Sequence, residues 1–402
     1  MTIVRRCAPV VTAASLAVAF SAAEPPPLPR ARPAAVGLAS APLAEATALL
    51  KRFVADRKIA GAVAAVARHG KLAYLEPVGV QDLETRAPMS ERSLFRIYSM
   101  TKPVTAAAVM MLFEEGRFAL DDPVSKYLPE FADVKVGLPD GSTRPPLRPI
   151  TVQDLLLHTS GFSHRTSELY RTARVRVRTD TLPQFVTKIT GAPLMEDPGT
   201  RFRYSEGTTV LGRLVEIWSG QPFDAFLEAR VFTPLGMTET SFWARPDQRA
   251  RLTTVYQSAR GGGLTPFEIE PEAPFTERPA LLEGAVGLVS TVPDFLRFCQ
   301  MLLNRGTLNG VRILSAKTVE MMTANGLPDA VLRARGGTRG WGLGNVDVTL
   351  GTGEYGWDGT AGTIFTVDPR HEMITVLMWQ SVPADPDGLR ARVKTLIDRA
   401  IE

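Results

Sequence analysis

Residues 94–103 read LFRIYSMTKP, and this stretch carries the pattern that decides the fold. Ser99 and Lys102 lie three residues apart, directly before the apolar run from Pro103 to Glu115, which predicts a helix. Residues three apart share one face of a helix, so the Lys102 ammonium can reach the Ser99 hydroxyl. The positive end of the helix dipole also favours an anionic serine at this position. The stretch therefore predicts a serine nucleophile with a lysine partner.

The Ser-x-x-Lys spacing is a weak signal on its own. An N-cap serine followed by a solvated lysine has the same spacing, so the motif is a hypothesis that needs support from the rest of the chain.

Strand patterns occur at both ends of the chain, with helical patterns between them. The predicted strands cover residues 60–67, 72–80, 281–289, 363–367 and 373–380. Predicted helices cover residues 43–54, 103–115, the segment around Cys299 and residues 389–401. This order predicts one sheet assembled from the two ends of the chain.

The first 23 residues differ from the rest. Arg5 and Arg6 precede an apolar stretch, and Ser21-Ala22-Ala23 offers small residues for cleavage before Glu24. This pattern predicts a cleaved secretory signal over residues 1–23, with an uncleaved anchor as the alternative. Residues 24–40 are rich in Pro and Ala and predict a linker before one domain over residues 41–402. We therefore expect an exported, periplasmic or extracellular protein with no stable membrane insertion after cleavage.

The composition is that of a globular protein, with 45% hydrophobic and 22% charged residues. Residues 1–23 contain two arginines and no acidic residue, so their removal lowers the formal net charge from +4 to +2, which is too small to indicate nucleic-acid binding. A basic cluster alternates with valines and predicts a solvated edge strand or loop. Its members are Arg171, Arg174, Arg176 and Arg178. Cys299 lies in a helical pattern that predicts a buried thiol.

Further motifs extend the pattern around Ser99. They are EEG at 114–116, LDDPV at 120–124, ITV at 150–152, LLLHTSG at 155–161, PGT at 198–200, FRYS at 202–205 and PLGM at 234–237. In combination they resemble the β-lactamase-related serine hydrolases, which include class C β-lactamases, penicillin-binding proteins, D-aminopeptidases and family VIII carboxylesterases. The resemblance covers about residues 43–380.

The resemblance implies an α/β (α+β) fold of the β-lactamase/transpeptidase type. An antiparallel sheet flanked by helices is expected from about residues 41–120 and 280–402. A helical lobe is expected from about residues 121–279, with the active site between the two parts.

Tyr204 matches the tyrosine of the family motif Tyr-x-Asn, which implies a general base close to Ser99. Serine is a poor nucleophile until a base takes its proton. A lysine ammonium beside a tyrosine is expected to lower the pKa of the tyrosine. The residues leave open whether Lys102 or Tyr204 accepts the proton.

The family's third motif, Lys-Thr-Gly in β-lactamases, corresponds here to Trp357-Asp358-Gly359. The resemblance implies an oxyanion hole from the backbone N–H groups of Ser99 and Thr360. Gly359 is expected to allow a close approach of backbone and ligand.

Two departures from the motifs bear on the substrate. Glu206 stands where β-lactamases carry Asn, and Asp358 stands where they carry Thr. We expect Trp357, Asp358, Gly359 and Glu206 to contact the substrate, although strand alternation can turn Asp358 away from the pocket. Without the third-motif lysine, neutral or cationic esters are expected to be preferred to substrates that carry a carboxylate.

Esterase activity ranks first among the functions considered, before D-amino-acid amidase or peptidase activity and β-lactamase activity. The alternative from another class is a non-catalytic, penicillin-binding-like or cell-wall-sensing module. A Ser-His-Asp hydrolase is disfavoured because no serine lies in Gly-x-Ser-x-Gly, and His158 is expected only to stiffen a turn. No metal-binding histidine spacing occurs, so no metal or cofactor is expected. The expected partner is a small-molecule ester or acyl substrate, and the oligomeric state stays open.

Overall fold

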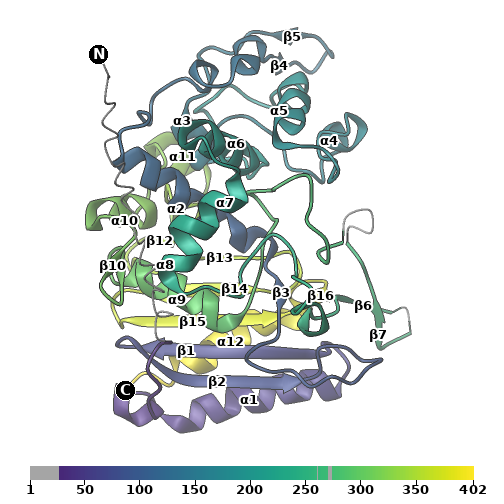
Figure 1. Cartoon of the computed structure of the whole chain (residues 1–402), viewed down its shortest axis with the longest axis vertical. Helices are drawn as coiled ribbons and strands as arrows, with labels where there is room; N and C mark the ends of the chain where they lie inside the picture. Colours follow the sequence, from purple (N-terminus) through teal and green to yellow (C-terminus); the bar gives the residue numbers. More distant parts are fainter. Residues whose placement is uncertain (1–26, 260, 270–273) are drawn as a thin grey trace, which may run out of the picture.

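The computed structural model describes residues 27–259, 261–269 and 274–402, and its centre is a seven-stranded antiparallel sheet (Figure 1). The strand order is β11-β12-β13-β14-β15-β1-β2. Its strands are β1 (Gly61–Arg68), β2 (Lys71–Gly79), β11 (Arg339–Trp341), β12 (Asp347–Thr349), β13 (Tyr355–Asp358), β14 (Ile364–Asp368) and β15 (Met373–Trp379). Because β1 pairs with β15, the two ends of the chain form one sheet, as the sequence predicts.

The β1–β2 hairpin turns at His69 and Gly70, whose φ angles are 51° and 72°. Two successive residues of positive φ match the right-handed twist of a tight hairpin. Every residue of β1 is buried, which explains its continuous run of alanine and valine. Alternate residues of β1 belong to the apolar cores on the two faces of the sheet.

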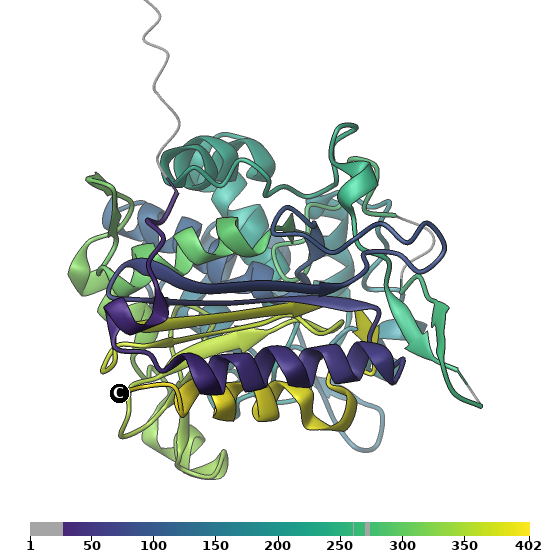
Figure 2. The same cartoon turned by 90° about the horizontal axis from the view of Figure 1, so that it is seen from below.

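Helices cover both faces of the sheet. Helices α1 (Ser40–Ala55) and α12 (Leu389–Asp398) lie together on one face (Figure 2). Helices α2 (Thr101–Glu114) and α9 (Val292–Leu303) lie on the other, and Cys299 in α9 is buried as predicted. Helix α2 is buried along most of its length and packs between the sheet and α6 (Gly207–Ser219). The sequence pattern of α2 is accordingly apolar all round.

In Figure 1, helices α3 to α6 of the helical lobe lie above α2, on the side away from β1 and β2. Its helices are α3 (Val152–Leu156), α4 (Glu168–Thr172), α5 (Leu182–Gly191), α6, α7 (Phe223–Leu227) and α8 (Thr233–Leu235). The middle of the chain also returns to the sheet side, because β6 pairs with β16. The remaining elements that we name are β3 (Phe95–Arg96), β4 (Val136–Gly137), β5 (Thr143–Arg144), β6 (Tyr256–Ser258), β7 (Leu264–Pro266), β8 (Val289–Ser290), β9 (Thr307–Leu308), β10 (Val311–Arg312), β16 (Ser381–Val382), α10 (Ala316–Thr323) and α11 (Asp329–Ala334).

The predicted strand over residues 281–289 is wrong except at its end, where β8 begins. The preceding residues form a buried, irregular segment. A Cβ added at Gly284 would lie 2.8 Å from the Thr208 backbone oxygen, so only glycine fits between α2 and α6 there. The segment is apolar because it is buried in the centre of the molecule.

The described residues before α1 follow the edge of the sheet. Ala31 donates its backbone N–H to Leu72 O, and Leu72 donates to Pro29 O, at 3.0 and 2.9 Å. The described part of the predicted linker therefore lies against β2. The predicted signal, residues 1–23, lies outside the described residues. Within them, no helix has both the length and the apolar character needed to cross a membrane.

Candidate active site

Ser99 lies at the turn that leads from β3 into α2. It belongs to a short 3-10 helix, η2 (Tyr98–Met100), and is 6% exposed. Tyr98, immediately before it, has a φ of 43°, which is rare for a residue with a large side chain. Such backbone strain concentrates at functional sites, where the surrounding structure holds it in place. The sharp turn presents Ser99 at the start of α2.

Lys102 is buried in the first turn of α2, and its Nζ lies 3.4 Å from Ser99 Oγ. The same nitrogen donates to the backbone oxygen of Ala285 at 3.0 Å and lies 4.5 Å from the centre of the Tyr204 ring. Burial lowers the pKa of Lys102 to about 7, although the negative charge of Glu206 opposes this shift. A lysine with this pKa is largely an uncharged amine slightly above neutral pH, and can accept a proton from Ser99.

Tyr204 comes from the loop before α6 and meets Ser99 from the helical lobe. Its hydroxyl makes a hydrogen bond with Ser99 and receives one from Trp357 Nε1 at 3.0 Å. Burial raises the pKa of Tyr204, and the two hydrogen bonds only partly offset this effect. The predicted lowering of this pKa is therefore wrong, because the removal of the phenol from water outweighs the hydrogen bonds with Ser99 and Trp357. Tyr204 is a neutral hydroxyl that can relay a proton.

Trp357 and Gly359, at the end of β13, are the points at which the sheet approaches Tyr204 and the Ser99 segment. The indole of Trp357, in β13, packs against Tyr204 with ring centres 5.2 Å apart. A Cβ on Gly359 would lie 2.5 Å from the backbone oxygen of Ile97, two residues before Ser99. The close approach predicted for Gly359 is thus to the protein's own backbone rather than to a ligand. It holds the turn with Thr360, which is exposed, beside the Ser99 segment.

Asp358 pairs with a cation away from Ser99, and its expected contact with substrate stays a prediction. Its neighbour Trp357 faces Tyr204, and strand alternation directs Asp358 to the opposite face of the sheet. There its carboxylate pairs with Arg390 at the start of α12. Burial raises the pKa of Asp358, and the Arg390 charge opposes that shift.

Glu206 is fully buried within the protein, and its expected contact with substrate stays a prediction. Its Oε1 accepts the backbone N–H of Arg165 at 3.3 Å and lies 3.7 Å from Arg165 Nη1 and 3.8 Å from His164 Nε2. Burial alone would raise its pKa, but the charges of Arg165 and Lys102 outweigh it and lower the pKa. Glu206 is therefore an anion that acts on Lys102 from within the protein.

Three further groups contact the site residues and were not predicted from the sequence. Arg165 donates from Nη2 to Thr360 Oγ1 at 3.2 Å, and so connects the helical lobe to the sheet. Trp341 packs edge-on against Trp357, with ring centres 4.6 Å apart. The Ala285 carbonyl binds Lys102. No motif marked these groups, since their roles depend on contacts between distant segments.

His158 ties two motif segments together. It has a φ of 55° and accepts the Ser205 backbone N–H at 3.3 Å, while its ring lies 4.8 Å from that of Tyr204. Burial lowers its pKa well below the usual value, so the ring is neutral. His158 therefore supports the loop that carries Tyr204, which agrees with the role in a turn that the sequence predicts.

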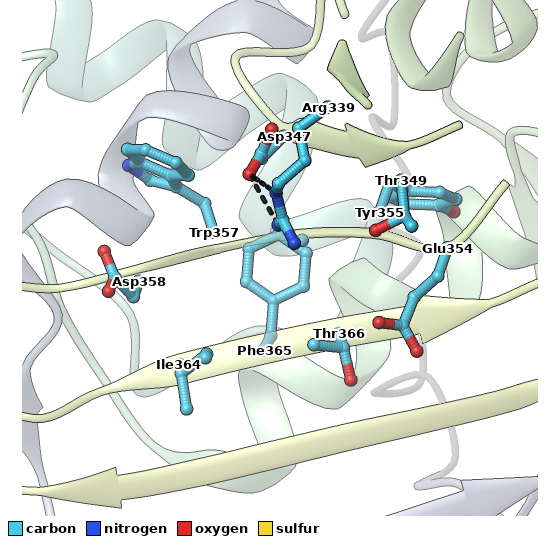
Figure 3. A pocket seen from close by; sticks show the side chains of 11 residues that line it. Arg339, Asp347, Thr349, Glu354, Tyr355, Trp357, Asp358, Ile364, Phe365 and Thr366 are labelled. Atoms are coloured by element: carbon cyan, nitrogen blue, oxygen red, sulfur yellow. Dashed lines mark hydrogen bonds and ion pairs between the residues drawn. The ribbon is translucent and has the colours of Figure 1, made fainter. Parts of the chain in front are cut away.

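A cavity of about 170 Å³ opens along β11 to β14, and its lining includes Trp357 but not Ser99, Lys102 or Tyr204 (Figure 3). Its acidic side chains are already paired: Asp347 with Arg339, Glu354 with Lys394 and Asp358 with Arg390. Among the residues that the structure describes, no group of three or more His, Cys, Asp and Glu side chains could hold a metal ion.

Comparisons with known proteins agree with this geometry. The Beta-lactamase family model matches residues 46–398. An uncharacterized protein of Mycobacterium tuberculosis is 35% identical over 353 residues, which cover 81% of this chain and 86% of the relative. Esterase EstB of Burkholderia gladioli is 38% identical over 226 residues, 54% of this chain and 56% of the esterase. The solved structure of EstCE1, a hydrolase with promiscuous acyltransferase activity, has a TM-score of 0.77 and 25% identity, and covers 89% of this chain and 98% of its own.

The pKa of Lys102 predicts how the reactivity of Ser99 depends on pH. Labelling of Ser99 by a fluorophosphonate should accelerate with pH and level off above about pH 7, where Lys102 has lost its proton. Glu206→Gln removes a charge that raises the pKa of Lys102, so the rise should move to lower pH. Second-order labelling rates over a pH series measure both profiles.

Glu115→Gln is the matched control, because Glu115 is a surface carboxylate paired with Arg230. It should leave the profile unchanged. A Glu206→Gln protein that is folded and keeps the wild-type profile would contradict the assigned influence of Glu206 on Lys102.

Proposed function

Because this chain belongs to the β-lactamase family and is a serine hydrolase, we propose that it cleaves carboxylic esters through an acyl-enzyme on Ser99. The observation that carries the proposal is the contact of Ser99 Oγ with Lys102 Nζ at 3.4 Å, in a site where burial lowers the pKa of that lysine to about 7. The likeness to proteins named as an esterase and a hydrolase supports the choice of reaction.

In the first step the uncharged Lys102 amine takes the Ser99 proton while Oγ attacks the ester carbonyl. The backbone N–H groups of Ser99 and Thr360 stabilise the oxyanion. Tyr204, which contacts Ser99, Trp357 and the Lys102 ammonium, passes a proton to the leaving alcohol and is reprotonated from Lys102. The products of this step are the acyl-enzyme and the free alcohol.

In the second step the same groups work in reverse. A water molecule occupies the place of the alcohol, gives its proton through Tyr204 to Lys102, and attacks the acyl carbonyl. Ser99 leaves as the alkoxide and recovers its proton from Lys102, so that the carboxylic acid is released and the enzyme returns to its starting state.

Trp357 favours neutral esters over substrates that carry a carboxylate. It occupies the position of the third-motif lysine, and its indole N–H is already used by Tyr204. The arginine in this part of the site, Arg165, is shared between Glu206 and Thr360. A substrate carboxylate therefore lacks a dedicated partner here.

The proposal extends to the protein's location and partners. Residues 1–23 act as a cleaved export signal, and residues 41–402 form the hydrolase domain, which works in the periplasm or outside the cell. Its partner is a small-molecule ester or acyl compound, with no part for nucleic acid.

The nucleophile is tested by Ser99→Ala. Hydrolysis of a short p-nitrophenyl ester should fall by about 10⁴-fold or more, as when other serine hydrolases lose their nucleophile. Mass spectrometry of the wild-type protein treated with a fluorophosphonate should show one adduct on Ser99. A folded Ser99→Ala protein with wild-type turnover would overturn the mechanism. A wild-type protein that hydrolyses no ester, D-amino-acid amide or β-lactam would favour the non-catalytic binding module.

Substrate charge is tested with two esters that differ only by a carboxylate on the acyl chain. The neutral ester should have a kcat/KM about ten- to a hundredfold higher, the equivalent of ~1–3 kcal/mol for a charged group without its partner. Trp357→Lys should narrow this ratio relative to Trp357→Met, because both variants lose the indole but only one gains a cation. Equal kcat/KM values for the two esters in the wild-type protein would exclude this basis of selectivity.

A further inference from the structure

A buried cluster of three charges lies beside the segment that binds Lys102. Glu283 is fully buried and accepts hydrogen bonds from Arg176 Nη2 at 2.7 Å and from Arg178 Nη1 at 2.6 Å. Burial alone would raise the pKa of Glu283, but the two arginine charges outweigh it and lower the pKa. The prediction of a solvated basic stretch is therefore wrong for Arg176 and Arg178. Alternation in the extended loop points both side chains inward, towards one carboxylate.

The residues that follow Glu283 form the floor of the Lys102 site. Helix α2 makes three polar contacts with this segment, which we call the 283–288 segment. Thr105 Oγ1 donates to Gly284 O at 2.7 Å, and Lys102 Nζ donates to Ala285 O at 3.0 Å. Leu288 donates its backbone N–H to Thr101 Oγ1 at 3.1 Å.

The contact with Ala285 bears on the direction of the Lys102 lone pair. An uncharged amine has two N–H donors and one lone pair, and only the lone pair can accept the Ser99 proton. When one N–H is held on Ala285 O, rotation about the Cε–Nζ bond is restricted. Errors of about 1 Å in the placement of a reacting group can cost roughly 10²-fold in rate.

We propose that Glu283 is a positioning residue, and that its pairing with Arg176 and Arg178 holds the Ala285 carbonyl where it orients the Lys102 amine towards Ser99. This inference rests on the proposed function, in which Lys102 takes the Ser99 proton. It assigns to the cluster a role besides stability, since buried ion clusters can often be replaced by apolar residues without loss of stability. Because the arginines precede α5, the helical lobe thereby controls a group on α2.

Glu283→Gln keeps the size of the side chain and removes its charge. We expect kcat for a neutral ester to fall about tenfold or more, with KM within about twofold, because the change affects proton transfer rather than substrate contacts. The charge of Glu283 also raises the pKa of Lys102, so the rise of kcat with pH should move to lower pH. The other groups that act on Lys102 are unchanged in this variant; they include Glu206, Arg165 and Tyr204.

Arg176→Gln provides a second variant, in case Glu283→Gln does not fold. It removes the Nη2 contact with Glu283 and should also lower kcat. The Arg176 charge lowers the pKa of Lys102, so the pH profile should now move to higher pH. A fall in kcat in both variants, with opposite shifts of the pH profile, distinguishes loss of positioning from a change of charge alone. Arg176→Lys, which keeps the charge, should recover part of kcat and the wild-type profile.

Asp294→Asn is the matched control for loss of a buried carboxylate. Asp294 lies at the start of α9 and accepts hydrogen bonds from the Glu239 backbone N–H and from Thr240 Oγ1, at 2.8 and 2.9 Å. It should lower the thermal midpoint and leave kcat and the pH profile of the folded protein unchanged. Folded Glu283→Gln or Arg176→Gln protein with wild-type kcat would overturn the inference. The proposed function would still stand if Ser99 remained the labelled and essential residue in that protein.

Discussion

The removal of the Lys102 amine from water is the constraint on which the rest of the site depends. In water a lysine is protonated at neutral pH and cannot act as a base, and here burial lowers its pKa to about 7. Helix α2 must then be buried as well, between the sheet and α6, and its sequence is apolar for that reason. Several groups offset the burial of Lys102: Ser99, the Ala285 carbonyl, and the negative charges of Glu206 and Glu283. The fold thus excludes water from the Lys102 amine and still provides it with hydrogen-bond partners.

The site is assembled from three separate parts of the chain. The turn before α2 provides Ser99, the first turn of α2 provides Lys102, the helical lobe provides Tyr204, and β13 provides Trp357. The Trp357–Tyr204 hydrogen bond and the Arg165–Thr360 hydrogen bond both cross from the lobe to the sheet. Because these bridges meet near Ser99, the relative placement of lobe and sheet determines the proton path. The hydrogen bonds of Arg176 and Arg178 with Glu283 connect the lobe to the 283–288 segment beside Lys102.

Sequence patterns predicted those features of the structure that depend on neighbouring residues in the chain. The long strands β1, β2, β14 and β15 and the helices α1, α2, α9 and α12 follow from periodicity and turn residues, and the motifs brought Ser99, Lys102 and Tyr204 to attention together. The rest depends on contacts between distant segments. Strands β11 to β13 have only three or four residues each, so the face on which Asp358 lies was not evident. The burial of Glu206 needs Arg165, 41 positions away, and the burial of Arg178 needs Glu283, 105 positions away. The pKa of Tyr204 is raised because burial in the folded protein outweighs its hydrogen bonds with Ser99 and Trp357.

The central claim is that Lys102 is an uncharged amine in the resting enzyme slightly above neutral pH, and its titration can be observed directly. Protein labelled with ¹⁵N at the lysine Nζ positions can be titrated by NMR. The account predicts one lysine signal with a pKa of about 7, absent in Lys102→Met and shifted to lower pH in Glu206→Gln. Lys126 provides a reference signal, because its hydrogen bond and ion pair with Asp122 raise its pKa above the ordinary lysine value of about 10.4. A spectrum in which the Lys102 signal titrates near that ordinary value would contradict the account.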